Sequence, residues 1–574
     1  MNLGQILNPS KFHFTIAGSK YKTAVQRFRA EEAISECYTV RLWLVSEYRI
    51  DPGDMLQKEA VLTINGKKED RFFHGVINQV SLTGQDGRFY LYQASLVPSF
   101  WFLSLNRDFR IFQEKSVAEI AEEVLRASGI PADRYDFRLV NDYEKRRYCT
   151  QFGESDWRFV SRLLEEEGIF YFFEHHKDKH VLVLADDTVA YVPIAGESEL
   201  QYQLGSGMVA EKEVVTGFVF SRGIKPGAVT QTSYNFKRPS LDLTVQQQGE
   251  TYPEHEIFEY PGDYANPDRG NRLARIRLEE KKTLQDSAQG NSNCPRLVPG
   301  CKFRLTRHDF NSLNAQYLLV SVTHTGTQGH VLGEQSGIGG DCSYGNEFQA
   351  IPASVTLRPE KLLRKPVVHG PHTAVVAGPE GEDVWPDPEG HLRVKVRFPW
   401  DRNGPKGDRS SCWIRVAQSW GGNGWGVQFI PRVGDEVLVA FQHGDPDRPI
   451  IVGSSYNAGN QPIYDLPAQK TQSGIRTRSV PGGGGFNELR FEDKKGAEEI
   501  FLHAQRDWKI KVENNKTEDV LGASAITVTG PLTEKAKEIT LTADSKITLV
   551  CGGSRIVMDA GSITIQSPTV KIND

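Results

Sequence analysis

The chain has 574 residues, of which 39% are hydrophobic and 25% are charged, and its formal net charge is −5. These values are typical of a soluble globular protein with roughly three to five domains. They exclude a strongly basic surface that would attract nucleic acid or anionic lipid. No stretch approaches the ~18 consecutive apolar residues of a membrane-spanning helix.

The N-terminal sequence and the cysteines bear on the cellular compartment. The chain begins Met1-Asn-Leu-Gly, without the basic and apolar segments of a signal peptide. Its seven cysteines are dispersed and none forms a C-x-x-C pair, which favours reduced thiols and argues against a zinc ribbon. We therefore expect a cytoplasmic protein whose export, if it is exported, needs another route.

The first 110 residues alternate between short apolar runs and turn sequences such as Asp-Pro-Gly and Asn-Gly. We expect strands at residues 12–16, 37–44, 60–64, 72–77 and 89–92. This pattern predicts a β-barrel or a β-sandwich.

Helices interrupt the strands after residue 110. Ser116 and Glu119 form a capping box, and Gly129 ends the helix that it starts. A second helix is expected at residues 155–167, followed by Gly168 and a hairpin of strands at 169–173 and 181–184. A third is expected at about 267–284, within a region of strands and polar loops from 190 to 350.

The segment 372–456 reads as a compact all-β unit behind a short linker. Its strands are expected at residues 373–376, 392–398, 413–416, 426–430, 436–441 and 450–452. Five or six short strands in this length fit a small closed barrel of the OB type. A neck rich in proline and glycine follows and ends at residues 481–485.

The C-terminal region repeats a short apolar–polar–apolar unit, which is typical of strands with one buried face. The units lie at residues 526–529, 539–542, 547–550, 556–558, 563–565 and 570–572. From Ile539 onward they start 8, 9, 7 and 7 residues apart, with Asp, Gly, Ser and Pro between them.

The repeat length indicates an architecture made by several chains. Eight extended residues reach at most about 26–29 Å, enough for one wall of a prism and one corner. Two more copies of the chain would supply the missing walls, which predicts a triangular β-prism with threefold symmetry. An ordinary run of β-hairpins remains the alternative. The side chains expected on the trimer axis are Ile539, Leu541, Ile547, Leu549, Ile556, Met558, Ile563 and Ile565.

Three passages resemble the VgrG spike proteins of type VI secretion systems, and also the hub-and-spike proteins of contractile phage tails. They are Arg147-Tyr-Cys-Thr-Gln-Phe-Gly-Glu-Ser-Asp156 with Arg162-Leu-Leu-Glu-Glu-Glu-Gly-Ile169; Trp413-Ile-Arg-Val416 with Pro431-Arg-Val-Gly-Asp-Glu-Val437; and Ser473-Gly-Ile-Arg-Thr-Arg-Ser479 with Asn487-Glu-Leu-Arg-Phe-Glu-Asp493. They sample the chain from about residue 145 to its end. The order of the domains is similar as well.

The resemblance implies a mainly β protein in four parts. Residues 1–365 would form the hub with two barrel-like domains and a few helices, and residues 372–456 the OB-fold domain. Residues 457–487 would form the neck, and 488–574 the β-helix needle made by three chains. Such a homotrimer would cap the Hcp hexamer tube, puncture the target membrane in transient contact with it, and be injected by the apparatus.

The resemblance also implies partners. These are an effector with its adaptor and a PAAR-repeat protein that sharpens the tip. Related phage spikes bind iron through a terminal His-x-His, but His503 is the only histidine after residue 488, so we expect neither metal nor cofactor. The tip protein is expected at Ser567, Pro568, Thr569, Val570, Lys571, Ile572, Asn573 and Asp574.

Two other functions stay open: a delivered cell-wall hydrolase, and the spike of another contractile particle. Related phage spikes carry a lysozyme domain, yet only about thirty residues separate Tyr456 from Asn487, too few for a catalytic core. Because the sequence stops with the repeat, we expect any toxin to travel as a partner and the chain itself not to be an enzyme.

Several residues that could carry chemistry have simpler interpretations. We expect residues 165–167 to be a solvated last helical turn rather than paired catalytic acids, and Asp156 to lack a Ser–His partner. His175, His176 and His180 are expected in a surface loop rather than at a zinc site, and the glycines of 421–424 and 481–485 in turns rather than phosphate loops.

The predicted OB barrel raises the alternative of binding to single-stranded nucleic acid. Its aromatic and basic residues are Trp400, Trp413, Trp420, Trp425, Arg393, Lys395 and Arg397. Because the three basic residues alternate along one strand, we expect an ordinary solvated face and no nucleic-acid partner.

Overall fold

The computed structural model describes residues 11–66, 69–203, 212–329 and 342–572. They form two compact units, one up to His503 and one from Ala504 onward, and each is described by itself. No helix in these ranges combines the length and the apolar character that crossing a bilayer requires.

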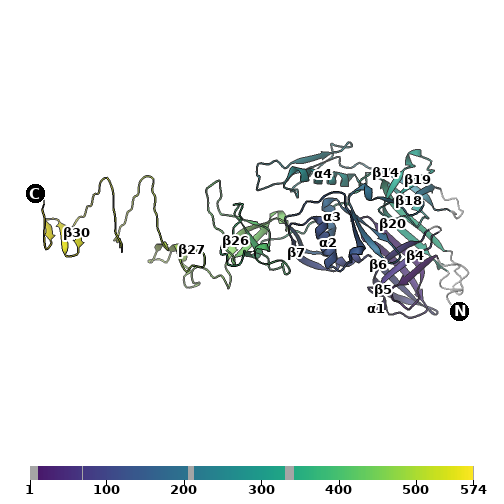
Figure 1. Cartoon of the computed structure of the whole chain (residues 1–574), viewed down its shortest axis with the longest axis horizontal. Helices are drawn as coiled ribbons and strands as arrows, with labels where there is room; N and C mark the ends of the chain where they lie inside the picture. The colour runs from purple at the N-terminus through teal and green to yellow at the C-terminus, as the bar shows by residue number, and fades with distance from the viewer. Residues whose placement is uncertain (1–10, 67–68, 204–211, 330–341, 573–574) are drawn as a thin grey trace. The chain divides into compact units, whose positions relative to one another are not determined.

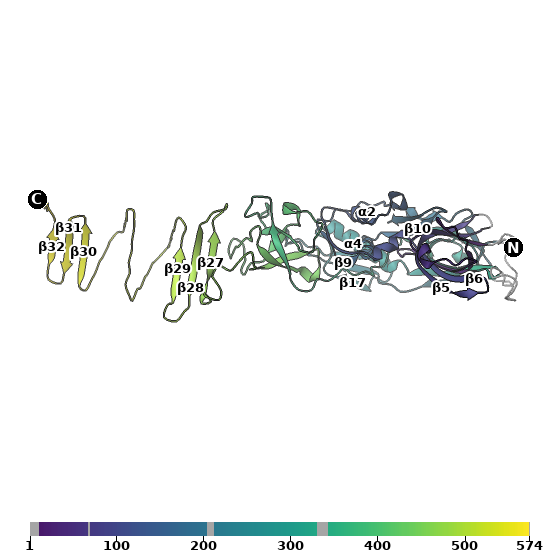
Figure 2. The same ribbon diagram turned by 90° about the horizontal axis from the view of Figure 1, so that it is seen from below.

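The first six long strands form a ring, seen at the N-terminal end of the chain in Figure 2. Their order is β1-β4-β5-β6-β3-β2, and a pairing of His13 with Ala24 joins β1 to β2. The strands are β1 (Phe12–Ile16), β2 (Ala24–Ala33), β3 (Thr39–Ser46), β4 (Glu59–Ile64), β5 (Arg71–Asp86) and β6 (Phe89–Val97). The predicted strands are therefore present, and they close as a barrel.

A second ring follows the order β20-β21-β18-β14-β13-β19, with β19 pairing back to β20. Its strands are β13 (Glu199–Tyr202), β14 (Val214–Arg222), β18 (Asp286–Ser292), β19 (Cys301–Thr306), β20 (Gln316–Thr327) and β21 (Ser343–Pro352), and β12 (Val192–Pro193) extends β19. Strands β2 and β20 pair along their length, so one sheet runs through both barrels.

Helices α2 (Val117–Ala127) and α3 (Asp156–Glu167) pack on each other in the same unit (Figure 1). The capping box of Ser116 and Glu119 is present, as predicted. Helix α3 begins after Ser155 and ends at Gly168, whose φ of 71° is left-handed and suits glycine. The chain then enters the predicted hairpin of β10 (Phe170–His175) and β11 (His180–Ala185), which β8 (Tyr135–Arg138) extends.

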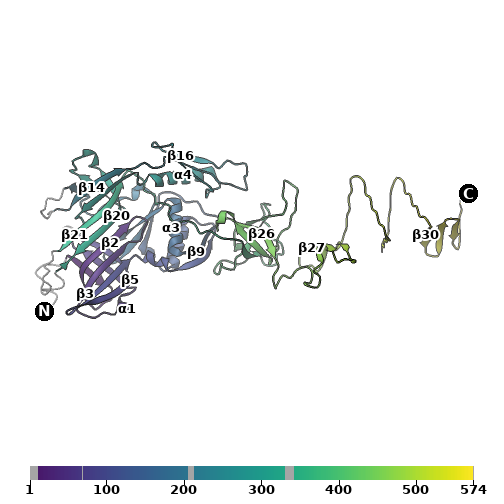
Figure 3. The same ribbon diagram turned by 180° about the vertical axis from the view of Figure 1, so that it is seen from behind.

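An inserted layer occupies residues 223–285, between β14 and β18. Helix α4 (Pro267–Lys282) lies against a sheet of β15 (Ala228–Gln231), β16 (Val245–Gln248) and β17 (Glu256–Glu259), as Figure 3 shows for α4 and β16. The layer has its own small core, which includes Val229, Leu243, Tyr264, Leu273 and Leu278.

The predicted OB unit is a closed barrel with the order β22-β23-β24-β26-β25. Its strands are β22 (His372–Ala377), β23 (Arg393–Arg397), β24 (Ile414–Val416), β25 (Glu436–Phe441) and β26 (Pro449–Ser455). The strand expected at 426–430 is wrong. That segment has no strand ladder: Gly426 forms an isolated bridge with Gly421, Val427 N donates to the Trp420 carbonyl, and Phe429 exchanges two hydrogen bonds with the side-chain amide of Gln418.

A three-stranded meander of β27 (Gln472–Arg478), β28 (Phe486–Glu492) and β29 (Glu499–His503) ends the first unit. The second unit has one antiparallel sheet of β30 (Lys546–Cys551), β31 (Ser554–Asp559) and β32 (Ile563–Gln566). These three repeat units pair with one another as hairpins, the alternative that the sequence left open.

The units at 526–529, 539–542 and 570–572 are not strands, contrary to expectation. A strand is defined by a ladder partner, and within the described part of this single chain these segments have none.

Candidate functional site: the needle and the buried ion clusters

The sheet of the second unit has an apolar face with two rows of side chains. Ile547, Met558 and Ile563 are opposite one another across the three strands, and so are Leu549, Ile556 and Ile565. The other face carries Thr548, Val557 and Thr564. Six of the eight predicted axis residues therefore lie on one face of one sheet.

This apolar face is uncovered in a single chain. Leu549 is 53% exposed and Ile563 is 68% exposed, and Ile539 and Leu541, which lie outside the strands, are exposed as well. An isolated sheet with an apolar face open to water is not stable on its own. The face therefore needs an apolar partner, and none of the described residues of one copy provides it.

The predicted tip-binding residues begin directly after β32. Ser567 is half-buried, and Val570 and Ile572 are exposed. Asn573 and Asp574 lie outside the described residues. Within the part of the chain that the structure describes, the side chains of Val570 and Ile572 are uncovered.

A second apolar row, which the sequence did not lead us to expect, crosses β27, β28 and β29, from the predicted neck into the predicted needle. Ile475, Leu489 and Leu502 lie opposite one another on β27, β28 and β29, and Phe491 pairs with Ile500 on the same face. The opposite face is mixed: it carries Phe486 and Phe501, and the Glu488 carboxylate there accepts hydrogen bonds from Arg476 and Tyr464. Apolar residues two positions apart, Leu489 and Phe491 on β28 and Ile500 and Leu502 on β29, could have indicated this row.

The acidic run at the end of α3 is not solvated, contrary to expectation. Glu166 and Glu167 are 7% and 2% exposed, and Arg146 bonds both, at 2.6 Å and 2.9 Å. Burial opposes ionisation of Glu166, but Arg146 and Arg162 outweigh it and hold its pKa well below the ordinary value. The carboxylates are held in ion pairs, which does not suit the acid–base work of a hydrolase.

Fully buried Arg162 extends the same network. Its Nη2 lies 2.6 Å from Glu154 Oε1 and 3.2 Å from the Thr150 carbonyl, and its Nη1 lies 3.1 Å from Glu166. Asp156 contacts Arg110 and accepts from Gln151 Nε2 at 2.8 Å. Polar residues of the segments 147–156 and 162–169 thus connect β9 (Cys149–Ser155) with α3.

His175 and His180 are also buried, so the surface-loop prediction is wrong for them, although His176 is exposed. Together with His74 and His324 they surround a buried ion pair, in which Arg71 Nη2 lies 2.7 Å from Glu32 Oε1. His175 Nε2 and His324 Nε2 lie 3.2 Å and 3.3 Å from Glu32. No cluster of His, Cys, Asp or Glu among the described residues is arranged to hold a metal ion.

The hydrogen bonds of His74, His175 and His180 require neutral rings. Ser99 N donates to His180 Nε2 at 2.9 Å, which places the proton on Nδ1, 3.0 Å from His74 Nδ1. The backbone N of His74 donates to His175 Nδ1 at 3.2 Å. Burial lowers the pKa of His74 to about 4 and also lowers the pKa of His175, His180 and His324.

On the basic strand of the OB barrel, Arg393 departs from the expected solvated face, whereas Lys395 and Arg397 are half-buried. Arg393 is fully buried, and its Nε donates to buried Asp387 at 2.6 Å. Lys395 Nζ donates to the Asp408 carbonyl at 2.6 Å and lies over the ring of Trp413. The guanidinium of Arg393 and the ammonium of Lys395 are thus held within the chain rather than presented together to a phosphate backbone.

Comparison with protein families covers most of the chain. Residues 31–330 match the phage tail baseplate hub (GPD), and residues 382–456 match the type VI secretion system/phage-baseplate injector OB domain. Residues 473–568 match the bacteriophage T4 gp5 C-terminal trimerisation domain. The last match includes both apolar rows and confirms the predicted fold class.

Curated relatives are similar over nearly the whole chain. The type VI secretion system spike protein VgrG5 of Pseudomonas aeruginosa is 40% identical over 89% of this chain, and VgrG1a of the same organism is 37% identical over 86%. VgrG3 of Vibrio cholerae is 35% identical over 90%. The chain spans 65%, 76% and 52% of the lengths of these relatives.

Solved structures share the fold. The E. coli c3393 protein, described as a component of the type VI secretion system with structural similarity to the T4 tail proteins gp27 and gp5, aligns with a TM-score of 0.57 at 24% identity, over 77% of this chain and 99% of that one. A chain of the half-lidded Francisella PdpA–VgrG complex aligns with a TM-score of 0.55 at 10% identity, over 86% of this chain and 88% of that one. The hub match and the curated relatives show that the chain belongs to the VgrG family of type VI secretion system spike proteins.

Proposed function

We propose that this protein is the spike of a type VI secretion system and works as a homotrimer. The observation that carries the proposal is the apolar face of β30–β32, which is exposed in one chain and lies within the match to a trimerisation domain. Three copies would turn these faces toward a common axis. Burying each Ile, Leu or Met side chain would contribute roughly 1.5–3 kcal/mol.

The mechanism of such a spike is mechanical. A prism closed by three chains has no free sheet edge, and every level is held by side chains from all three copies. Such a prism is a stiff needle. It would pass through the target membrane and contact it only transiently. The hub–OB–needle order would place the needle at the leading end.

The partners follow from the same geometry. Two barrels per chain give six in a trimer, which suits the sixfold ring at the end of an Hcp tube. The exposed apolar end after β32 suits a PAAR-repeat tip protein bound at residues 567–574. An effector, with its adaptor, would travel on the trimer, as the PdpA complex of a structural neighbour suggests. The protein would be cytoplasmic before firing and delivered by the apparatus.

The test is release of Hcp into the medium by a host whose other spike genes have been removed. We expect the wild-type gene to restore release, and a variant truncated after His503 to fail because its trimerisation segment is incomplete. Release that does not depend on this gene would contradict the proposal. Deleting residues 567–574 should leave the trimer intact and abolish capture of the tip protein; capture by that variant would remove the proposed tip site.

A further inference from the structure

The Trp loop, residues 417–430, follows β24 in the OB barrel and displays a pair of exposed tryptophans. Trp420 and Trp425 are 62% and 58% exposed, and their rings meet edge to face with centroids 5.1 Å apart. Phe429, near the end of the same loop, is also exposed. The three aromatic side chains make a concentrated apolar surface on one loop.

The Trp loop is held in one conformation by its own backbone. Gly422 N donates to the Trp425 carbonyl at 2.9 Å, and Val427 N donates to the Trp420 carbonyl at 2.9 Å. Gly422 leaves no room for a larger residue, because a Cβ there would lie 2.2 Å from the ring of Trp425. A loop that is already ordered loses little conformational entropy when it binds, which favours a role in recognition.

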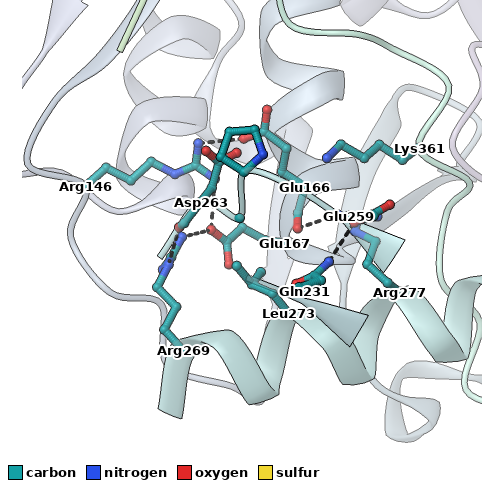
Figure 4. A pocket seen from close by; sticks show the side chains of 12 residues that line it. Arg146, Glu166, Glu167, Gln231, Glu259, Asp263, Arg269, Leu273, Arg277 and Lys361 are labelled. Atoms are coloured by element: carbon teal, nitrogen blue, oxygen red, sulfur yellow. Dashed lines mark hydrogen bonds and ion pairs between the residues drawn. The ribbon is translucent and has the colours of Figure 1, made fainter. Parts of the chain in front are cut away.

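Polar clusters of the same unit are satisfied within the chain, as Figure 4 shows for Arg146 and Arg269 around Glu167. The tryptophans differ, because the described residues leave more than half of each one uncovered. Tryptophan is enriched among the side chains that anchor protein–protein interfaces. The Trp loop therefore has the properties of an interface loop.

A groove of about 700 Å³ lies between the OB barrel and β27. The barrel side contributes Phe429, Ile430 and Tyr456, and β27 contributes Ile475. Tyr456 and Ile475 are 59% and 50% exposed, so part of the lining is apolar and open. Arg478 also lines the groove with a side chain that is 60% exposed, and a guanidinium is attracted to the face of an indole ring.

The groove is continuous with the surface expected to bring three chains together. Strand β27 lies at the start of the segment 473–568 that matches a trimerisation domain, and Ile475 belongs to the apolar row with Leu489 and Leu502. In a cyclic trimer one surface of each copy meets a different surface of the next copy. A protruding aromatic loop and a partly apolar groove on the same chain form such a pair.

We propose that Trp420 and Trp425 of one copy dock into the groove at Phe429 and Ile475 of the next copy. The Trp loop lies outside the segment matched to the trimerisation domain, so this contact would join the three OB barrels as well as the needle strands. The inference rests on the homotrimer proposed above and adds where two copies meet.

The test is photo-crosslinking of the full-length protein with p-benzoylphenylalanine in place of Trp425, which exchanges one aromatic residue for another. After irradiation and boiling in SDS, we expect covalent dimers and trimers on a gel. Mass spectrometry should place the links in residues 428–435, 456–463 or 474–478 of a second copy. The reciprocal variant carries the probe in place of Ile475, and its links should fall within residues 418–427 of a second copy.

The control carries the probe in place of Phe258, which is 62% exposed on the inserted layer, and should give no link to the groove. Light scattering on each sample separates this inference from the proposed function. A trimer in which both probes give only monomeric bands, or link to residues outside these segments, would overturn the docking and leave the homotrimer standing. A monomer before irradiation would contradict both.

Discussion

At the scale of single residues, the sequence identified the charged and titratable groups but did not predict which of them are buried. Glu166, His180 and Arg393 were expected at the surface and are buried. Some of the partners come from distant parts of the chain: His180 contacts His74, 106 positions away, and Glu167 pairs with Arg269, 102 positions away. Others are close in sequence, such as Asp387, six positions before Arg393. A local pattern cannot distinguish a solvated charge from one that a remote segment will neutralise.

The buried histidine cluster makes stability dependent on pH. Its rings are neutral in the fold, with pKa values below the ordinary ~6.5 that they regain on unfolding. Below about pH 6.5 the unfolded chain therefore binds more protons, and stability is lost as the pH falls toward the folded pKa, about 4 for His74. Thermal unfolding at a series of pH values should show this decline.

A substitution can separate the contribution of the histidine cluster to the pH dependence of stability from the contribution of the acidic side chains. We expect His180→Gln to lower the melting temperature at pH 7, because the ring bridges Ser99 N and His74, and to weaken the decline between pH 6.5 and 4. Exposed His176→Gln is the control and should decline like the wild type. An equal decline in His180→Gln would show that this ring does not titrate on unfolding.

At the scale of elements, predictions succeeded where local rules decide the structure. Ser116 with Glu119 and Gly168 marked helix ends correctly because caps involve only neighbouring residues. Strand predictions failed where a partner was needed: in the segment 426–430 an isolated bridge and bonds to the Gln418 side chain take the place of a ladder, and among the described residues the segment 526–529 has no partner strand.

Two substitutions on neighbouring residues of β30 test whether the apolar face of β30–β32 is buried in the trimer. Leu549→Asp would bring three carboxylates together inside the trimer, each costing several kcal/mol unless it is paired or protonated. We expect loss of the SDS-resistant trimer on a gel. Thr548→Asp changes the neighbouring residue on the opposite face and should keep the trimer. Equal resistance of both variants would mean that the Leu549 face is turned to water.

At the scale of the whole molecule, a repeat too short to enclose a core predicted an assembly of several chains. The family matches confirm the order of hub, OB barrel and trimerisation domain. The exact domain borders remain predictions. The expected border between neck and needle at 487/488 falls inside β28, and the apolar row of Ile475, Leu489 and Leu502 extends across it.

The central claim is that three chains share one hydrophobic needle. Light scattering coupled to size-exclusion chromatography, at physiological salt, measures this most directly. We predict one species with three times the 64.3 kDa of the chain. A folded, monodisperse monomer of 64.3 kDa would contradict the account.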